Sequence, residues 1–217
     1  LLIVGTGPGL AAGSGDDTAL GADRAGVLRR AAGCAARELA GMDSAAFLLP
    51  ADDVDELRAV TEGALVGAYA WSGRVPASKA PLGRVVVATV LADSAEASAA
   101  EARAIALAEA TALARDLVNE PPNRLTPHTF AQRARAVADD AGLGIDILDE
   151  ALLREQGFGG IVGVGQGSVH PPFLVRVSWV PENPAQRIAL IGKGITFDSG
   201  GLSLKPPAPV SYTHLTL

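Results

Sequence analysis

Two residues whose chemistry could act together, Lys193 and Asp198, lie five positions apart in a glycine-rich stretch. Glycines flank the lysine on both sides, and glycine allows the tight turns that bring separated side chains back to one point. The stretch follows an apolar run at 188–191, and open α/β sheets bind ligands just beyond the carboxyl ends of their strands. The pattern favours a ligand-binding loop, and the alternative for such a pair is a surface ion pair.

The elements that must position this loop can be predicted from hydrophobic periodicity and capping residues. In the first ninety residues, apolar runs of strand length alternate with apolar positions at helical spacing, an order typical of helices packed on a sheet. The sequence therefore predicts an α/β fold. The expected elements are a strand at 1–4, a helix at 22–40, a strand at 45–49, a helix from Asp52 or Asp53 to about 69, and a strand at 84–91.

A long alanine-rich helix is expected from about 95 to 118, and a proline pair ends it because proline cannot continue the hydrogen-bond ladder. We interpret Asn119 and Glu120 as fixing the turn between two domains. Thr126 is expected to cap the next helix, with Pro127 at its first position. The remaining expected elements are that helix to about 141, a strand at 144–148, a helix at 149–156, a glycine-rich stretch at 157–167, and strands at 173–180 and 187–191.

Composition excludes several classes of protein. The 217 residues are 48% hydrophobic and carry a net charge of −6, without a Lys/Arg cluster, so no nucleic-acid partner is expected. No apolar run reaches the length of a membrane span, and the pattern of the first residues does not predict a signal peptide. The single cysteine, Cys34, lies among alanines in a helical pattern and is expected to be a buried, inert thiol in a reducing cytoplasm.

The segment at 192–206, GKGITFDSGGLSLKP, closely resembles the leucyl aminopeptidase (cytosol aminopeptidase) family of metallopeptidases. Three upstream segments agree with it: Glu62-Gly63 with Gly67-Ala68-Tyr69, VNEPPNRLTP at 118–127, and GVGQGSVHPP at 163–172. The resemblance extends from about residue 1 to Pro207. It implies an N-terminal, macro-like α/β domain followed by the first part of an α/β/α zinc-peptidase-like catalytic domain.

The resemblance also implies a role for each residue of the loop. Lys193 would be a metal ligand through its neutral amine, Asp198 would bridge two divalent ions (Mn²⁺ or Zn²⁺), and Lys205 would be the catalytic lysine that stabilises the substrate carbonyl. A nearby dication favours loss of the ligand lysine's proton. The implied enzyme is a cytoplasmic, homohexameric aminopeptidase that releases N-terminal residues, often leucine, from peptides.

The resemblance implies four parts: an N-terminal α/β domain fragment at 1–93, a linking helix at 94–118, the start of the catalytic domain at 119–209, and a tail at 210–217 that does not match the family. The family's next metal-binding aspartate falls eleven positions beyond Lys205, where this chain has Thr216. Two of the family's five metal ligands are then present, so we expect this polypeptide to be inactive and not to form the hexamer. Because Met42 is the only methionine and Leu1 lies in an expected strand, we expect truncation at both ends.

Other interpretations come from other classes of function. A fold-retaining protein that binds or scaffolds without catalysis fits the missing ligands. The turn at 5–10 could suggest a nucleotide-binding fingerprint, but its third glycine position is Leu10, which favours a plain turn. We expect solvated or capping roles for His128 and His170, and none for His214.

Overall fold

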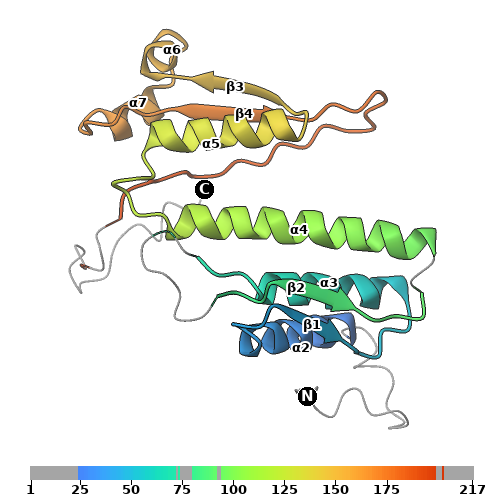
Figure 1. Cartoon of the computed structure of the whole chain (residues 1–217). Helices are drawn as coiled ribbons and strands as arrows, with labels where there is room; N and C mark the ends of the chain where they lie inside the picture. The colour runs from blue at the N-terminus through green and yellow to red at the C-terminus, as the bar shows by residue number, and fades with distance from the viewer. Residues whose placement is uncertain (1–23, 72, 74–79, 92–93, 199–201, 203–217) are drawn as a thin grey trace, which may run out of the picture. The chain divides into compact units, whose positions relative to one another are not determined.

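The computed structural model describes residues 24–71, 73, 80–91, 94–198 and 202, and the chain divides into two compact units, Leu1–Asn119 and Glu120–Leu217. Figure 1 shows the order of the elements. Helices and strands are mixed along the chain, in agreement with the predicted α/β class. None of the helices in the described ranges is long and apolar enough to cross a membrane. The strand predicted at 1–4 and the turn at 5–10 lie outside the described residues.

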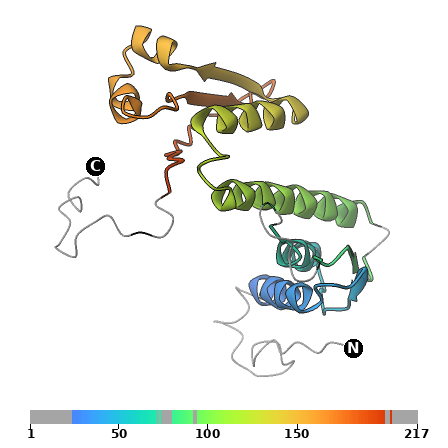
Figure 2. The same ribbon diagram turned by 60° about the vertical axis from the view of Figure 1, so that its left-hand side comes forward.

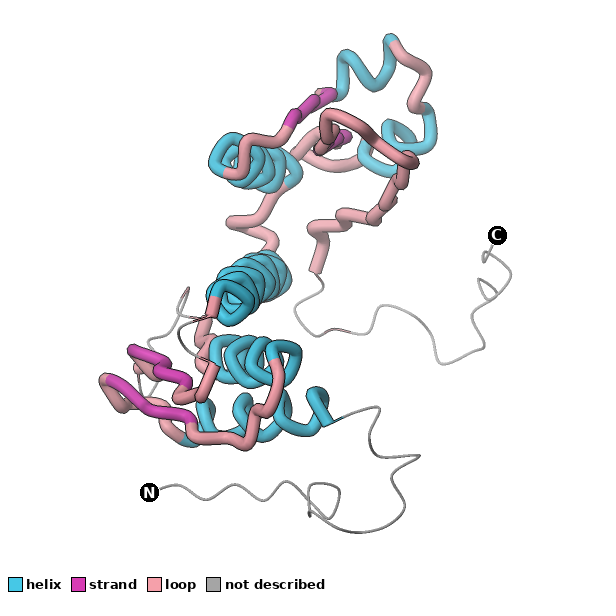
Figure 3. Tube along the Cα trace, turned by 90° about the vertical axis from the view of Figure 1, so that its right-hand side faces the viewer, coloured by secondary structure: helices cyan, strands magenta, loops and turns pink. Residues whose placement is uncertain are grey.

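The first unit contains α2 (Arg24–Glu38), β1 (Ser44–Phe47), α3 (Val54–Gly67), β2 (Arg84–Val87) and α4 (Ala95–Asn119). Strands β1 and β2 are parallel, with Ser44 opposite Arg84 and Phe47 opposite Val87, and α3 forms the crossover between them. Figures 2 and 3 show α2 and α3 on one side of these two strands. The predicted strand–helix–strand order of this region is confirmed, although both strands are shorter than predicted.

Local sequence explains where α3 begins. The side chain of Asp53 accepts a hydrogen bond from the backbone N–H of Glu56 at 2.9 Å, which satisfies one of the donors that a helix start leaves open. Asp53, and not Asp52, is therefore the N-cap. Arg24, at the start of α2, forms ion pairs with Asp52 and with Glu56, at 2.6 Å each. These pairs hold the beginnings of α2 and α3 together.

Alanines and a few larger apolar side chains form the core between the helices and the strands of this unit. Leu28 and Val60 are fully buried, and Phe47 packs against them from β1. Helices α2 and α3 cross closely because glycines replace side chains at their contact: a Cβ added at Gly63 would overlap the carbonyl oxygen of Arg29. The core therefore depends on close backbone approach more than on large side chains.

Cys34 is a correction to the sequence analysis. Its residue is exposed, and its sulfur accepts a hydrogen bond from Arg37 at 3.1 Å. The buried face of α2 contains Leu28, Ala32 and Ala36, and Cys34 lies off this face. In a helix composed mostly of small residues the periodicity does not define one face sharply, so the burial prediction was wrong.

The second unit contains α5 (Pro127–Asp140), β3 (Gly144–Leu148), α6 (Glu150–Glu155), α7 (Gly159–Gly165) and β4 (Leu174–Ser178). Strands β3 and β4 are antiparallel, and a cross-strand ion pair joins Asp146 to Arg176 at 2.5 Å. The predictions for α5, β3, α6 and β4 are confirmed. The glycine-rich stretch at 157–167 contains a helix, α7, which glycine content did not indicate.

Candidate active site

Two of the three predicted site residues lie after β4, in the segment at 179–198, which is neither helix nor strand. Lys193 and Asp198 are both exposed there, and Lys205 lies outside the described residues. The strand predicted at 187–191 is therefore wrong. A strand needs a neighbour for its backbone hydrogen bonds and cover for its apolar side chains. Leu190 and Ile191 are 94% and 98% exposed, so they have no such cover.

The donor types of Lys193 and Asp198 fit a divalent ion, because an amine nitrogen and a carboxylate oxygen are both ligands that Zn²⁺ or Mn²⁺ can take. Their number does not complete a dinuclear site. Among the residues that the structure describes, no three His, Cys, Asp or Glu side chains gather as metal ligands. The two residues can thus supply part of a ligand set, and the rest of the set has to come from other residues.

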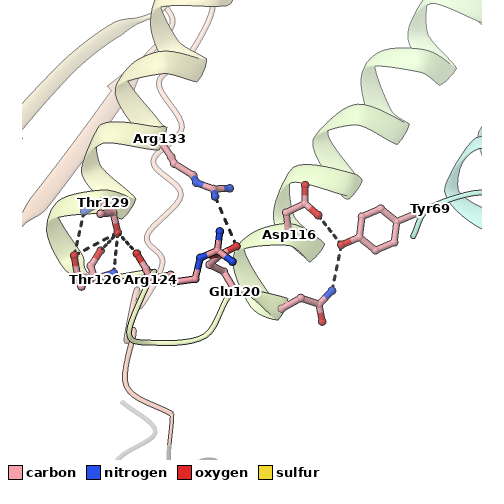
Figure 4. Close-up of polar contacts among 8 residues, drawn as sticks. Tyr69, Asp116, Glu120, Arg124, Thr126, Thr129 and Arg133 are labelled. Carbon is pink, nitrogen blue, oxygen red and sulfur yellow. Dashed lines mark hydrogen bonds and ion pairs between the residues drawn. The ribbon is translucent and has the colours of Figure 1, made fainter. Parts of the chain in front are cut away.

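The turn after α4 is fixed by a buried carboxylate, shown in Figure 4. The side chain of Glu120 is only 7% exposed, and it pairs with Arg124 at 2.8 Å and with Arg133 at 3.7 Å. The two guanidinium groups compensate the charge of the buried carboxylate. Glu120 therefore holds the turn to the first half of α5 within the second unit. This agrees with the structural, non-catalytic interpretation of Glu120.

A capping box begins α5, with its first residue, Thr126, six positions after Glu120 (Figure 4). The Thr126 side chain accepts from the backbone N–H of Thr129 at 3.3 Å, and the Thr129 side chain accepts from the backbone N–H of Thr126 at 2.8 Å. Both donors at this helix start are thereby satisfied. The predicted cap at Thr126 and the position of Pro127 are confirmed.

The two described histidines have local contacts. The ring of His128 lies 5.8 Å from that of Phe173, between centroids, so it packs α5 against the residue before β4. The backbone N–H of His170 donates to the hydroxyl of Ser168 at 3.1 Å. Both histidines are exposed, in agreement with the solvated role expected from the sequence. His214 lies outside the described residues.

A polar cluster in the first unit was not predicted from the sequence, where Tyr69 belongs only to a short family-like motif. The Tyr69 hydroxyl donates to Asp116 at 2.7 Å and accepts from Asn119 at 3.2 Å (Figure 4). The guanidinium of Arg115 lies 4.7 Å from the centre of the Tyr69 ring. Burial, and then the hydrogen bond to Asp116, raise the pKa of Tyr69 above its ordinary value. The cluster ties the end of α3 to the last turns of α4.

Similarity to known proteins extends over most of the chain. Residues 112–214 match the family profile "Cytosol aminopeptidase family, catalytic domain". A probable cytosol aminopeptidase of Leifsonia xyli subsp. xyli is 48% identical over 83% of this chain and 36% of its own length. A probable cytosol aminopeptidase of Streptomyces avermitilis is 44% identical over 94% of this chain and 41% of its own length. The chain thus spans well under half the length of these relatives.

A solved structure shares the fold. The bottromycin maturation enzyme BotP is 41% identical, with a TM-score of 0.71 over 84% of this chain and 40% of that chain. The structure of BotP in complex with Mn is 37% identical, with a TM-score of 0.63 over 73% of this chain and 34% of that chain. The structural similarity covers both units of the fold. The segment that contains Lys193 and Asp198 lies within the residues that match the family profile.

Proposed function

Because the chain belongs to the cytosol aminopeptidase family, we propose that the longer protein of which it forms part is an aminopeptidase. It releases N-terminal residues from peptides, with a leucine-type preference, by hydrolysis at two divalent metal ions. The match of residues 112–214 to the family's catalytic domain carries this proposal, since the match includes Lys193, Asp198 and Lys205. The proposal concerns the whole protein, because the chain spans 36% and 41% of the two relatives.

Each of the three residues has a distinct task in the proposed reaction. Lys193 would hold a metal ion through its amine nitrogen, and Asp198 would offer its carboxylate oxygens to the ions. The bound ions would supply a water activated for attack at neutral pH. Lys205 keeps its positive charge and stabilises the negative charge that develops on the substrate carbonyl oxygen. Mn²⁺ and Zn²⁺ are the candidate ions, and the Mn complex of BotP supports a divalent ion of this kind.

The chain of 217 residues is by itself inactive in this proposal. A dinuclear site needs further acidic ligands to balance charge and fix geometry, and the described residues gather no such set. We assign residues 1–93 to an N-terminal α/β domain, 94–118 to a linking helix and 119–209 to the start of the catalytic domain. The complete enzyme would be cytoplasmic and hexameric. The match to the family profile extends to residue 214, so it includes most of the segment at 210–217 that was expected to lie outside the family.

The experiment begins with the gene. Sequencing the DNA beyond the codon of Pro209 should reveal a reading frame that encodes further acidic residues of the catalytic domain. The protein expressed from that extended frame should hydrolyse leucyl peptides, and thorough chelation should abolish the hydrolysis. The chain of 217 residues, assayed beside it, should not hydrolyse leucyl peptides. Calorimetry should show that it binds Mn²⁺ only weakly. An extended protein that remains fully active after chelation would overturn the proposal, and one that neither hydrolyses peptides nor binds metal would favour a non-catalytic binding protein.

A further inference from the structure

A groove in the first unit lies apart from Lys193 and Asp198 in the sequence and has no part in the proposed hydrolysis. It has a volume of about 380 Å³ and is bounded by α2, by α3 and by Thr111 of α4. This volume suits a small molecule, since ligand pockets begin at roughly 300 Å³. The three elements that form it pack together within one unit.

Positive charge is concentrated around this groove. Three arginines of α2 line it (Arg29, Arg30 and Arg37), and Glu62 is the one acidic residue among the lining residues that the structure describes. The chain as a whole carries a net charge of −6, so the excess of guanidinium groups here is opposite to the average surface. Such a local concentration attracts anions. Guanidinium groups also offer paired donors that match the oxygens of phosphate.

Arg29 and Arg37 each have a contact that an anion could replace or share. Arg37 donates to the Cys34 sulfur at 3.1 Å, and sulfur is a weak acceptor compared with a phosphate oxygen. Arg29 contacts Glu62 through its Nε at 3.4 Å, which leaves the terminal nitrogens of the guanidinium for another acceptor. Both side chains reach solvent, so the donors are accessible to a ligand.

The remaining lining indicates what kind of anion the groove fits. Glycines of both helices line the groove, and Gly63 places no side chain into it. The described residues of the lining include no aromatic ring, so they offer no stacking surface of the kind that proteins use for nucleic-acid bases. Among these residues Val66 is the one large apolar side chain. The described part of the lining thus offers charge recognition without recognition of a base.

We propose that this groove binds a small, multiply charged phosphate compound through Arg29, Arg30 and Arg37. The shared chemistry is the phosphate group, carried either by an inorganic anion or by a phosphate ester. The site is independent of the proposed metal ions, because all of its residues lie in the first unit and none is a predicted ligand.

Cys34 provides a direct measure of occupancy. It is the single cysteine of the chain, it is exposed, and it lines the groove, so a bound ligand should shield it from alkylation by the uncharged reagent N-ethylmaleimide. A ligand at ten times its Kd leaves about one site in eleven free, so pyrophosphate should slow alkylation about tenfold in a saturable way. NaCl at the same ionic strength should not slow the alkylation. The measurement uses the full chain, and parallel arms with inorganic phosphate and glucose 6-phosphate distinguish the two sources of the phosphate.

Variants separate binding from general screening. The protection should be lost in Arg29→Gln/Arg37→Gln and retained in Arg103→Gln/Arg135→Gln, which removes the same charge from exposed positions outside the groove. Circular dichroism checks that the variants are folded. Equilibrium dialysis of radiolabelled phosphate against the unaltered chain gives an independent result, expected to be saturable binding of about one anion per chain. Any of four results would overturn the proposal. NaCl could slow alkylation as much as pyrophosphate does, or the protection could be retained in Arg29→Gln/Arg37→Gln. Citrate could protect equally well, or dialysis could show no saturable binding.

Discussion

The hydroxyl of Tyr69, two residues after α3, lies 2.7 Å from a carboxylate oxygen of Asp116 near the end of α4. The contact joins residues 47 positions apart in the sequence. Asn119, the last residue of α4, donates to the same hydroxyl. The phenol therefore both donates and accepts a hydrogen bond, and the end of the long helix is fixed within the first unit by a side chain from another element.

Replacement of Tyr69 by Phe should destabilise the first unit. The change leaves the carboxylate of Asp116 and the amide of Asn119 without this partner, and a hydrogen bond to a charged group contributes about 1.5–3 kcal/mol. Urea unfolding followed by Trp71 fluorescence in a Trp179→Phe background reports on this unit alone, since each unit contains one tryptophan. Asp116→Asn keeps an acceptor and should show a smaller loss. An unchanged unfolding midpoint in Tyr69→Phe would contradict the role of the contact.

The same tyrosine makes the first unit sensitive to alkaline pH. Its pKa is raised above 10.0 in the folded protein, first by burial and then by the hydrogen bond to Asp116. The unfolded chain therefore loses this proton at a lower pH than the folded chain, and the contribution to stability is full below pH 10.0 and is lost as the pH rises through the folded pKa. The difference in tyrosinate absorbance between the unaltered chain and Tyr69→Phe isolates this titration. A midpoint at or below 10.0 would contradict the prediction.

Glu120 should matter more for stability than an exposed ion pair of the same type. Its carboxylate is 7% exposed between Arg124 and Arg133, so Glu120→Gln removes a charge that both guanidinium groups face. We expect the free energy of unfolding to fall by about 1–2 kcal/mol. This is less than for a fully buried pair, because the two arginines are half exposed. Glu150→Gln, which breaks the exposed pair with Arg154, should lose about 0.5 kcal/mol or less. Unfolding followed by Trp179 fluorescence in a Trp71→Phe background measures both, and equal losses would show that burial of Glu120 has no effect.

Two glycine substitutions should change stability in opposite directions. A Cβ at Gly63 would overlap the backbone of Arg29, so Gly63→Ala should separate α2 from α3 and destabilise the first unit by about 2–3 kcal/mol. Gly163 in α7 has nothing within 4 Å of an added Cβ. Gly163→Ala should therefore stabilise the second unit by about 0.5–1 kcal/mol, because alanine loses less backbone entropy in a helix. The tryptophan reporters measure each unit, and a neutral Gly63→Ala would rule out the close crossing.

Local signals allowed much of the fold to be predicted from the sequence. The start of α5 was predicted because its cap, Thr126, and its first residue, Pro127, are adjacent in the chain. Strand β3 was predicted with its observed bounds because turn residues flank an apolar alternation. These features depend on residues within one or two turns of each other, and the capping and turn rules describe such neighbours well.

Features that depend on distant residues could not be predicted in the same way. The apolar run at 187–191 has strand composition, but its side chains are exposed because strand formation needs a partner from elsewhere in the sequence. Tyr69 and Asp116 carry no local signal that they meet. The predicted site residues Lys193 and Asp198 were selected by residue type and spacing, and their roles stay a prediction because the described residues gather no further metal ligands.

The metal content of the protein from the extended reading frame tests most directly whether Lys193 and Asp198 hold divalent ions. After gel filtration in metal-free buffer, the unaltered protein should retain about two Mn²⁺ or Zn²⁺ ions per chain. Asp198→Asn should lose most of this metal, and its hydrolysis of leucyl peptides should fall at least about a hundredfold. Asp146→Asn, which changes an exposed carboxylate paired with Arg176, should keep both the metal and the activity. Full metal content together with full activity in Asp198→Asn would contradict the proposed role of Asp198.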